Sequence, residues 1–109
     1  MIHAVGLLEK HCAPCESVPL LGSAEIETYA KEVLEWKVVE NKKLKKEFRF
    51  KDFSAAMGFV NQVATIAEAE GHHPNISIFY SRVALELWTH GAGGLTENDF
   101  ILAAKINGV

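Results

Sequence analysis

The sequence predicts an α+β domain, a two-layer sandwich in which three helices cover one face of a four-stranded antiparallel sheet. Three segments carry apolar residues at helical spacing, and four short segments alternate apolar and polar residues as half-buried strands do. The strands occur in two pairs, and each pair is joined by a turn short enough for a hairpin. The predicted order is therefore α-β-β-α-β-β-α.

The first 22 residues show no sustained periodicity, and Pro14, Pro19 and Gly22 interrupt them. We expect a loosely ordered arm, residues 1–22, which holds Cys12 and Cys15, followed by a single domain over residues 23–109. Ser23 is placed to cap the first helix. The apolar stripe of that helix is predicted to consist of Ile26, Tyr29, Ala30, Val33 and Leu34.

Two strands are predicted next, over residues 36–40 and 43–50, with a hairpin turn at Asn41-Lys42. Phe48 and Phe50 share one face of the second strand. Basic residues surround these phenylalanines, an arrangement that also occurs in RNA-binding strands. Alternation explains the phenylalanines as core and leaves a solvated basic edge, which is the interpretation we favour.

A long helix is predicted to follow, with Asp52 as its N-cap and Gly71 as the left-handed residue that ends it. Gly58 inside this helix costs about 1 kcal/mol relative to alanine, unless it allows close packing. The predicted buried stripe consists of Phe53, Ala56, Met57, Val60, Val63, Ala64 and Ala67.

The second hairpin is predicted from residues 76–80 and 82–90, which places Trp88 and His90 on the polar face of the last strand. Residues 91–94, Gly-Ala-Gly-Gly, form a tight loop. They lack the third glycine of a dinucleotide fingerprint and the lysine of a nucleotide loop. Thr96 and Asp99 then have the spacing of a capping box for the last helix.

The composition excludes several classes of protein. The chain has 109 residues, 49% of them hydrophobic, which fits one compact domain, and its formal net charge of −3 argues against nucleic-acid or anionic-membrane binding. We find no apolar run long enough to span a membrane and no secretion signal in the first ten residues, so we expect a cytoplasmic protein. Because a domain of this size is stable by a small margin, we also expect a homo-oligomer, a dimer or a tetramer.

Three of the five histidines, His72, His73 and His90, lie at predicted loop edges. Imidazole has an unperturbed pKa of roughly 6.5, which suits proton transfer near neutral pH. Adjacent histidines in a loop can equally be solvated. Pro74 restricts His73 to extended backbone angles, and this preorganisation favours a catalytic role.

Two carboxylates are candidates to support these histidines. Glu68 lies one turn before His72, at the helix end that the helix dipole makes unfavourable for a carboxylate, so we expect it to orient an imidazole. Asp99 has a simpler interpretation, because a Thr-x-x-Asp start satisfies backbone donors at any helix N-terminus.

A zinc site is the rival use of these histidines, with Cys12, Cys15 and His11 as further ligands. The spacing fits it poorly, because one Cys-Ala-Pro-Cys pair stands without a second cysteine pair or a His-x3-His partner. A redox role for the cysteines is also open, although no β-α-β pattern surrounds them. We expect no metal.

Taken together, these residues resemble the pterin-4a-carbinolamine dehydratase family, also known as the dimerization cofactor of a hepatocyte nuclear factor. The family signature is an acidic residue, three residues, His-His-Pro, five residues, an aromatic residue, nine residues, His, eight residues and Asp. It falls here on Glu68, residues 72–74, Tyr80, His90 and Asp99. The resemblance covers about residues 23–107, and the cysteine arm looks like that of many bacterial members. Asn75 and Ser81 stand where an acidic residue and an asparagine are expected.

The resemblance implies a hydro-lyase that removes water from a 4a-hydroxytetrahydropterin to give the quinonoid dihydropterin, in the recycling of a tetrahydrobiopterin-type cofactor. It implies no metal or organic cofactor, and it implies an aromatic amino acid hydroxylase as a partner enzyme. We expect His73 to protonate the leaving hydroxyl, and His72 and His90 to remove the N5 proton or hold the ring. We expect three residues to contact the pterin: Pro74, Trp88 and Thr89. The alternative is a non-enzymatic, oligomeric interaction protein or coactivator.

Overall fold

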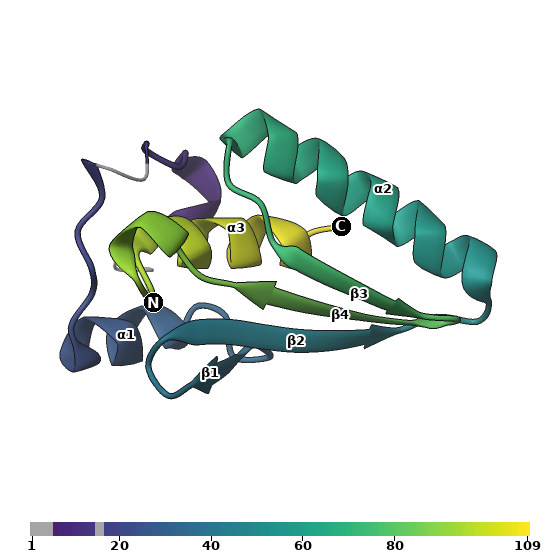
Figure 1. Ribbon diagram of the computed structural model, residues 1–109, viewed down its shortest axis with the longest axis horizontal. Coiled ribbons are helices and arrows are strands. Elements are labelled where there is room, and N and C mark those ends of the chain that lie inside the picture. The colour runs from purple at the N-terminus through teal and green to yellow at the C-terminus, as the bar shows by residue number, and fades with distance from the viewer. Residues whose placement is uncertain (1–5, 15–16) are drawn as a thin grey trace.

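The computed structural model describes residues 6–14 and 17–109. It confirms the predicted fold class and the order of the main helices and strands (Figure 1). Two short 3-10 helices, η1 and η3, are added to that order. The elements are η1 (Leu7–Glu9), α1 (Ser23–Ala30), β1 (Lys37–Val39), β2 (Lys43–Arg49), α2 (Phe53–Glu70), β3 (Asn75–Phe79), β4 (Arg82–Leu87), η3 (His90–Ala92) and α3 (Glu97–Asn107).

The four strands form one antiparallel sheet in the order β1-β2-β4-β3. In Figure 1 both α2 and α3 lie on the same side of this sheet. The register places Leu44 opposite Leu87 and Ile76 opposite Leu85, so apolar side chains from β2, β3 and β4 share the covered face. Because β4 is central and its Val83, Leu85 and Leu87 are fully buried, it anchors the core.

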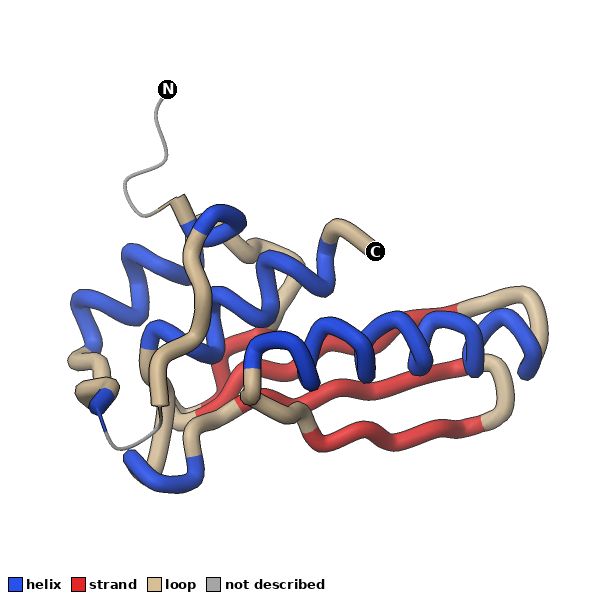
Figure 2. Tube along the Cα trace, turned by 90° about the horizontal axis from the view of Figure 1, so that it is seen from above, coloured by secondary structure: helices blue, strands red, loops and turns tan. Residues whose placement is uncertain are grey.

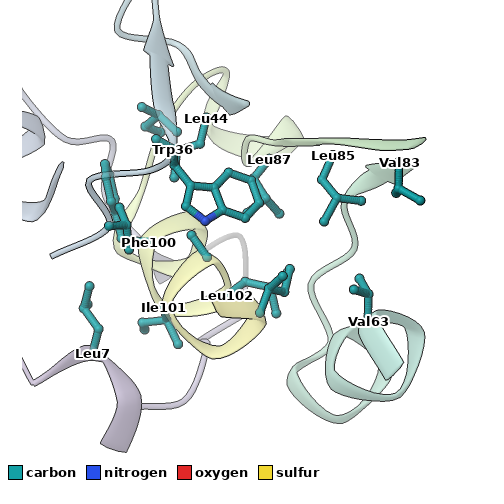
Figure 3. Close-up of a cluster of buried hydrophobic side chains, with 14 of the residues drawn as sticks. Leu7, Trp36, Leu44, Val63, Val83, Leu85, Leu87, Phe100, Ile101 and Leu102 are labelled. Carbon is teal, nitrogen blue, oxygen red and sulfur yellow. The ribbon is translucent and has the colours of Figure 1, made fainter. Parts of the chain in front are cut away.

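The core lies between the sheet and the helices (Figure 3). Trp36 precedes β1 and is buried against Leu44, Leu87 and Phe100, and its indole N–H donates to Asn107 Oδ1 at 2.9 Å. That bond satisfies the one polar atom of the Trp36 side chain, so the ring can be buried without cost to hydrogen bonding.

The first helix differs from its prediction at both ends. Its N-cap is Gly22 and not Ser23, and the backbone N–H of Gly22 donates to the Glu25 carboxylate at 3.0 Å. The helix ends at Ala30, so the helical stripe does not continue. Val33 is buried in the following turns, whereas Leu34 is 78% exposed, and its predicted burial is wrong.

The buried stripe of α2 is narrower than predicted and is rotated. Phe53 and Ala64 are exposed, and Phe59, which the predicted stripe leaves out, is buried. The cause is the sheet beneath, where the Phe48 and Phe50 rings lie 4.5 and 5.0 Å from the Phe59 ring. The residues buried along α2 are Ala56, Phe59, Val63 and Ala67. Phe48 of β2 and Phe50, which directly follows the strand, therefore both pack against the core, as alternation predicts.

The last strand is shorter than predicted, because β4 ends at Leu87 and not at His90. Thr89 forms an isolated antiparallel bridge with Gly94, and η3 fills the loop between them. Gly93 has a φ of 77°, a left-handed conformation that L side chains avoid, which supports the interpretation of the glycine-rich segment as a tight turn.

The described parts of the arm pack against the domain. Leu7 is 3% exposed and joins the core cluster, and the Leu21 backbone N–H donates to the Leu95 carbonyl at 2.9 Å. Cys15 lies outside the described residues. Among the residues that the structure describes, no helix is both long and apolar enough to cross a membrane.

Candidate active site

The end of α2 sets the positions of the two adjacent histidines. Asp52 caps the start of this helix through Ala55 N–H, as predicted, and Gly71 ends it with a φ of 67°. The left-handed residue turns the chain sharply, and the His72 backbone N–H closes the helix end by donating to Ala67 O. As a result, His72 is buried at 5% exposure, whereas His73 points to solvent.

His72 is paired with Asp99, at 2.6 Å between Nε2 and Oδ1, and the Asp99 side chain is fully buried. The other oxygen, Oδ2, accepts hydrogen bonds at 2.9 Å from the Thr96 backbone N–H and the Thr89 hydroxyl. Since the Thr89 proton goes to Asp99, the Thr96 hydroxyl donates to Thr89 Oγ1 at 2.7 Å. Asp99 thus caps α3, as its spacing from Thr96 predicts. It also contacts Thr89 at the start of the His90 loop, and its contact with His72 was not predicted.

His73 is paired with Glu68, at 2.6 Å between Nε2 and Oε2. The two side chains are 59% and 77% exposed. The prediction that Glu68 contacts His72 is wrong, because one-turn spacing applies only within a helix and Gly71 breaks the helix between them. Glu68 still contacts an imidazole, but the neighbouring one.

His90 comes from the other segment and stacks on Trp88, with 4.3 Å between ring centroids and 30° between planes. Lys43 Nζ lies 4.8 Å from the centroid of the Trp88 ring. The Trp88 indole therefore stacks on the His90 ring, and it also makes a cation–π contact with the ammonium group of Lys43 from β2.

These segments enclose a cleft of about 310 Å³. The structure brings His72, His73 and His90 together with Pro74 and Trp88 in its lining. The complete lining is Gly71, His72, His73, Pro74, Asn75, Trp88 and His90. Thr89, a predicted substrate contact, is absent from this lining: its side chain is fully buried and binds Asp99, and its backbone N–H and C=O bind within the loop.

The alternative roles of the cysteine arm find little support in Cys12. Burial, reinforced by the charge of Glu70, raises the pKa of the Cys12 thiol to about 12. A protonated thiol is a poor zinc ligand and a poor nucleophile. Within residues 6–14 and 17–109, no three His, Cys, Asp or Glu side chains are grouped to hold a metal ion.

The basic strand is matched by carboxylates on neighbouring positions. Glu86 lies 3.8 Å from Lys43 and 3.9 Å from Lys45, and Glu47 lies 2.6 Å from Arg82 and 3.1 Å from Arg49. The hydrogen bond from Arg82 holds the pKa of Glu47 below its ordinary value. This pairing gives the strand mixed charge, which favours a solvated sheet surface over a site for RNA phosphates.

An α+β sandwich whose cleft is lined by three imidazoles, two of them hydrogen-bonded to carboxylates, belongs to a class of proteins whose site holds several groups able to exchange protons near neutral pH. Comparison with known families makes this class specific. The chain belongs to the Pterin 4 alpha carbinolamine dehydratase family, a family of hydro-lyases whose model matches residues 19–109.

Relatives that carry the name of this dehydratase match nearly the whole chain. A protein of Rickettsia canadensis is 50% identical over 102 residues, which cover 92% of this chain and 94% of that protein. A protein of Rubrobacter xylanophilus is 42% identical over 102 residues, covering 93% and 95% of the two chains.

Two solved structures are similar. A transcriptional coactivator/pterin dehydratase from Brucella melitensis has a TM-score of 0.76 at 37% sequence identity, and the match covers 81% of this chain and 95% of that one. A pterin dehydratase-like protein identified as a RuBisCO assembly factor in the alpha-carboxysome has a TM-score of 0.57 at 25% identity, covering 68% and 87%.

Proposed function

We propose that this chain catalyses the dehydration of a 4a-hydroxytetrahydropterin by general acid and base catalysis, with the cleft histidines as the proton carriers. The observation that carries the proposal is the convergence of His72, His73 and His90 on one cleft of about 310 Å³. The size fits a small bicyclic substrate. The names of the relatives at up to 50% identity support the substrate class.

The reaction needs one acid and one base. The C4a–O bond breaks, and the hydroxyl leaves as water with a proton that we assign to His73. The proton on N5 moves to His72 or His90 as the C4a–N5 double bond forms, which completes the quinonoid dihydropterin. Positioned proton transfer of this kind contributes about 10²–10⁴-fold to the rate.

The two carboxylates suit the imidazoles to this task. Asp99 accepts from Nε2 of His72 and Glu68 accepts from Nε2 of His73, so Nδ1 is the nitrogen of each ring that those carboxylates leave for the substrate. To act as the acid, His73 must carry a second proton on Nδ1, as an imidazolium, whereas an unprotonated Nδ1 on His72 can accept the N5 proton. A fixed tautomer and ring orientation are the usual benefits of such a carboxylate. In this proposal the carboxylates are positioning residues and not proton carriers.

The walls of the cleft suit a flat heterocycle. Pro74 and Trp88 supply apolar surface, and Asn75 supplies a polar side chain at the position where the family pattern has an acidic residue. Because the Trp88 ring stacks on the His90 ring, we assign to Trp88 the role of orienting that imidazole. Thr89 acts behind the cleft by supporting Asp99.

The test is stopped-flow dehydration of freshly generated substrate by the purified protein. We expect the wild type to exceed the uncatalysed rate and His73→Ala to lower the enzymatic rate by about 10²–10⁴-fold. Asn61→Ala, a change at an exposed position of α2 outside the cleft lining, is the control and should retain the full rate. Full activity in His73→Ala would remove His73 as the acid.

A second measurement separates metal-dependent from metal-independent chemistry. We expect the rate to be unchanged after incubation with a chelator. Loss of activity that zinc restores would overturn the proposed mechanism and return the cysteine arm to consideration.

An interaction role is the second candidate, because the Brucella structure is named a coactivator as well as a dehydratase. The chain exposes apolar side chains outside the cleft, in the turns after α1 and at the end of β3, with Leu34 78%, Phe79 51% and Tyr80 71% exposed. We propose that a homo-oligomer, a dimer or tetramer, covers part of this surface, and a hydroxylase that forms the substrate remains the proposed partner enzyme. Sedimentation equilibrium of the wild type and of Leu34→Glu and Phe79→Glu tests the oligomer.

The triple histidine variant and the surface variants together distinguish the two candidate functions. If His72, His73 and His90 are all replaced by alanine and the biological activity persists, while the Leu34 or Phe79 variant abolishes it, binding is the function and dehydration is not.

A further inference from the structure

The segment that follows η1, residues 10–13, runs past the end of α2 and across the start of α3 (Figure 2). It precedes the part of the chain that the family model matches, which begins at residue 19. Its Lys10 side chain pairs with Glu97 at the surface, and its hydrogen bonds to buried residues fall on two positions, Glu70 and Asn98.

The first anchor is Glu70, the last residue of α2. Its Oε1 accepts from the Cys12 backbone N–H at 2.8 Å, and its Oε2 lies 2.9 Å from His11 Nδ1 and 3.7 Å from Lys105 Nζ. The carboxylate is only 6% exposed. Burial opposes its ionisation, but the Cys12 hydrogen bond, His11 and Lys105 outweigh burial and hold the pKa of Glu70 below its ordinary value.

The second anchor is Asn98, in the first turn of α3. Its Oδ1 accepts from the Ala13 backbone N–H at 3.0 Å, and its Nδ2 donates to the Ala13 carbonyl at 2.7 Å. The Cys12 thiol donates to the Asn98 carbonyl at 3.6 Å, and the protonated state of that thiol suits it to this role. Asn98 is 2% exposed, so these bonds are shielded from water.

The two anchors flank the buried pair of the cleft. Glu70 lies two residues before His72, and Asn98 directly precedes Asp99. The distance between His72 and Asp99 depends on how the end of α2 meets the start of α3, and the segment binds both ends. Cys12 alone contacts both anchors, through its backbone N–H and its thiol.

We propose that residues 10–13 form a clamp that positions the catalytic site, with Glu70 and Asn98 as positioning residues that hold His72 and Asp99 at hydrogen-bonding distance. This inference rests on the proposed function for its kinetic consequence, but its structural consequence can be measured without any activity. The clamp gives the cysteine-containing arm a role in the site without metal or redox chemistry.

The kinetic test compares two asparagines of the same helix. Asn98→Ala removes both side-chain hydrogen bonds to Ala13 and so weakens one of the two anchors of the clamp, whereas Asn107→Ala removes the hydrogen bonds to Trp36 and Lys46 at the other end of α3. We expect Asn98→Ala to lower kcat about 10-fold with KM within about twofold, since misplacement of a catalytic group affects the chemical step. Asn107→Ala should retain kcat even if it lowers the melting temperature.

A milder variant guards against unfolding. Ala13→Pro removes the N–H that the arm donates to Asn98, and it changes no residue of α2 or α3. It should lower kcat in the same direction by a smaller factor. Glu70→Ala should resemble Asn98→Ala, and Glu70→Gln, which keeps an oxygen acceptor for Cys12 N–H, should recover part of the loss.

The structural readout is the His72 Nε2 proton in NMR spectra of the ¹⁵N-labelled protein, assigned by its absence in His72→Gln. A proton in a 2.6 Å hydrogen bond to a buried carboxylate resonates far downfield, and we expect this signal to shift upfield or broaden in Asn98→Ala and Ala13→Pro but not in Asn107→Ala. If the variants keep both kcat and the signal, the clamp is wrong. If the signal responds but the wild type lacks dehydratase activity, the proposed function is wrong and the clamp stands.

Discussion

The adjacent histidines form two imidazole–carboxylate pairs of equal length in opposite surroundings. Both pairs have 2.6 Å between Nε2 and the carboxylate oxygen. His72 and Asp99 are 6% and 0% exposed at their side chains, whereas His73 and Glu68 are 59% and 77% exposed. Because water screens the outer pair and competes for its hydrogen bond, equal distances do not mean equal free energies.

The inner pair, His72 and Asp99, is also surrounded by further hydrogen bonds. Asp99 also binds Thr89 and Thr96, and the flanking residues Glu70 and Asn98 bind the arm. Glu68, by contrast, pairs with His73 at the exposed edge of the site. The inner pair is thus held by several elements, whereas the outer pair is exposed to water.

The largest expected effect comes from removing the inner carboxylate. Asp99→Ala leaves a buried imidazole and a helix start without their partner, and we expect the free energy of unfolding to fall by roughly 3–5 kcal/mol, with loss of dehydration activity. The matched control is Asp52→Ala, which removes an aspartate that caps α2 through Ala55 N–H but contacts no histidine, and it should cost about 1 kcal/mol.

Urea denaturation of the wild type and both variants measures this difference, with Asp99→Asn as a substitute if the alanine variant does not fold. Equal losses at Asp99 and Asp52 would show that the contact with His72 adds nothing beyond the helix cap.

A smaller effect is expected at Gly71, which ends α2 directly before the two histidines. Gly71 adopts a φ of 67°, and a left-handed conformation costs an alanine about 1–2 kcal/mol. An added Cβ would meet no atom within 4 Å there, so Gly71→Ala tests backbone conformation and not crowding.

The control for Gly71 is Gly58→Ala in the same helix, where an added Cβ also meets nothing within 4 Å and φ is not positive. Gly58→Ala should raise stability by about 0.5–1 kcal/mol, since glycine weakens a helix interior. Thermal unfolding of both variants decides the point, and stabilisation by Gly71→Ala would contradict a conformational role for Gly71.

Features set by neighbouring residues were predictable from the sequence. The caps at Asp52 and Gly71 and the alternation along β4 depend on a few consecutive positions, and the structure confirms all three. Likewise the topology brings His90 to the His72-His73 cleft, because a β-hairpin returns the chain to the strand end where it began.

Features set by contacts between distant elements were not predictable. His72 and Asp99 are 27 positions apart, and their contact depends on where α3 packs against the end of α2. Asn98 carries no local signal, since a polar residue in a first helical turn is ordinary. Leu34 was expected to be buried only because the first helix was expected to continue past Ala30.

The smallest expected effect comes from the outer carboxylate. Glu68→Gln should change the free energy of unfolding by less than about 1 kcal/mol, because an exposed pair contributes little and added salt screens it. If Glu68 orients His73, kcat should fall by less than in His73→Ala, and the difference from wild type should shrink at high salt.

Asp99→Asn is the matched comparison, since its loss arises in a buried pair and should persist at high salt. Stopped-flow rates and urea denaturation at low and high salt measure both; a larger effect at Glu68 than at Asp99 would reverse the assignment of the inner pair as the fixed part of the site.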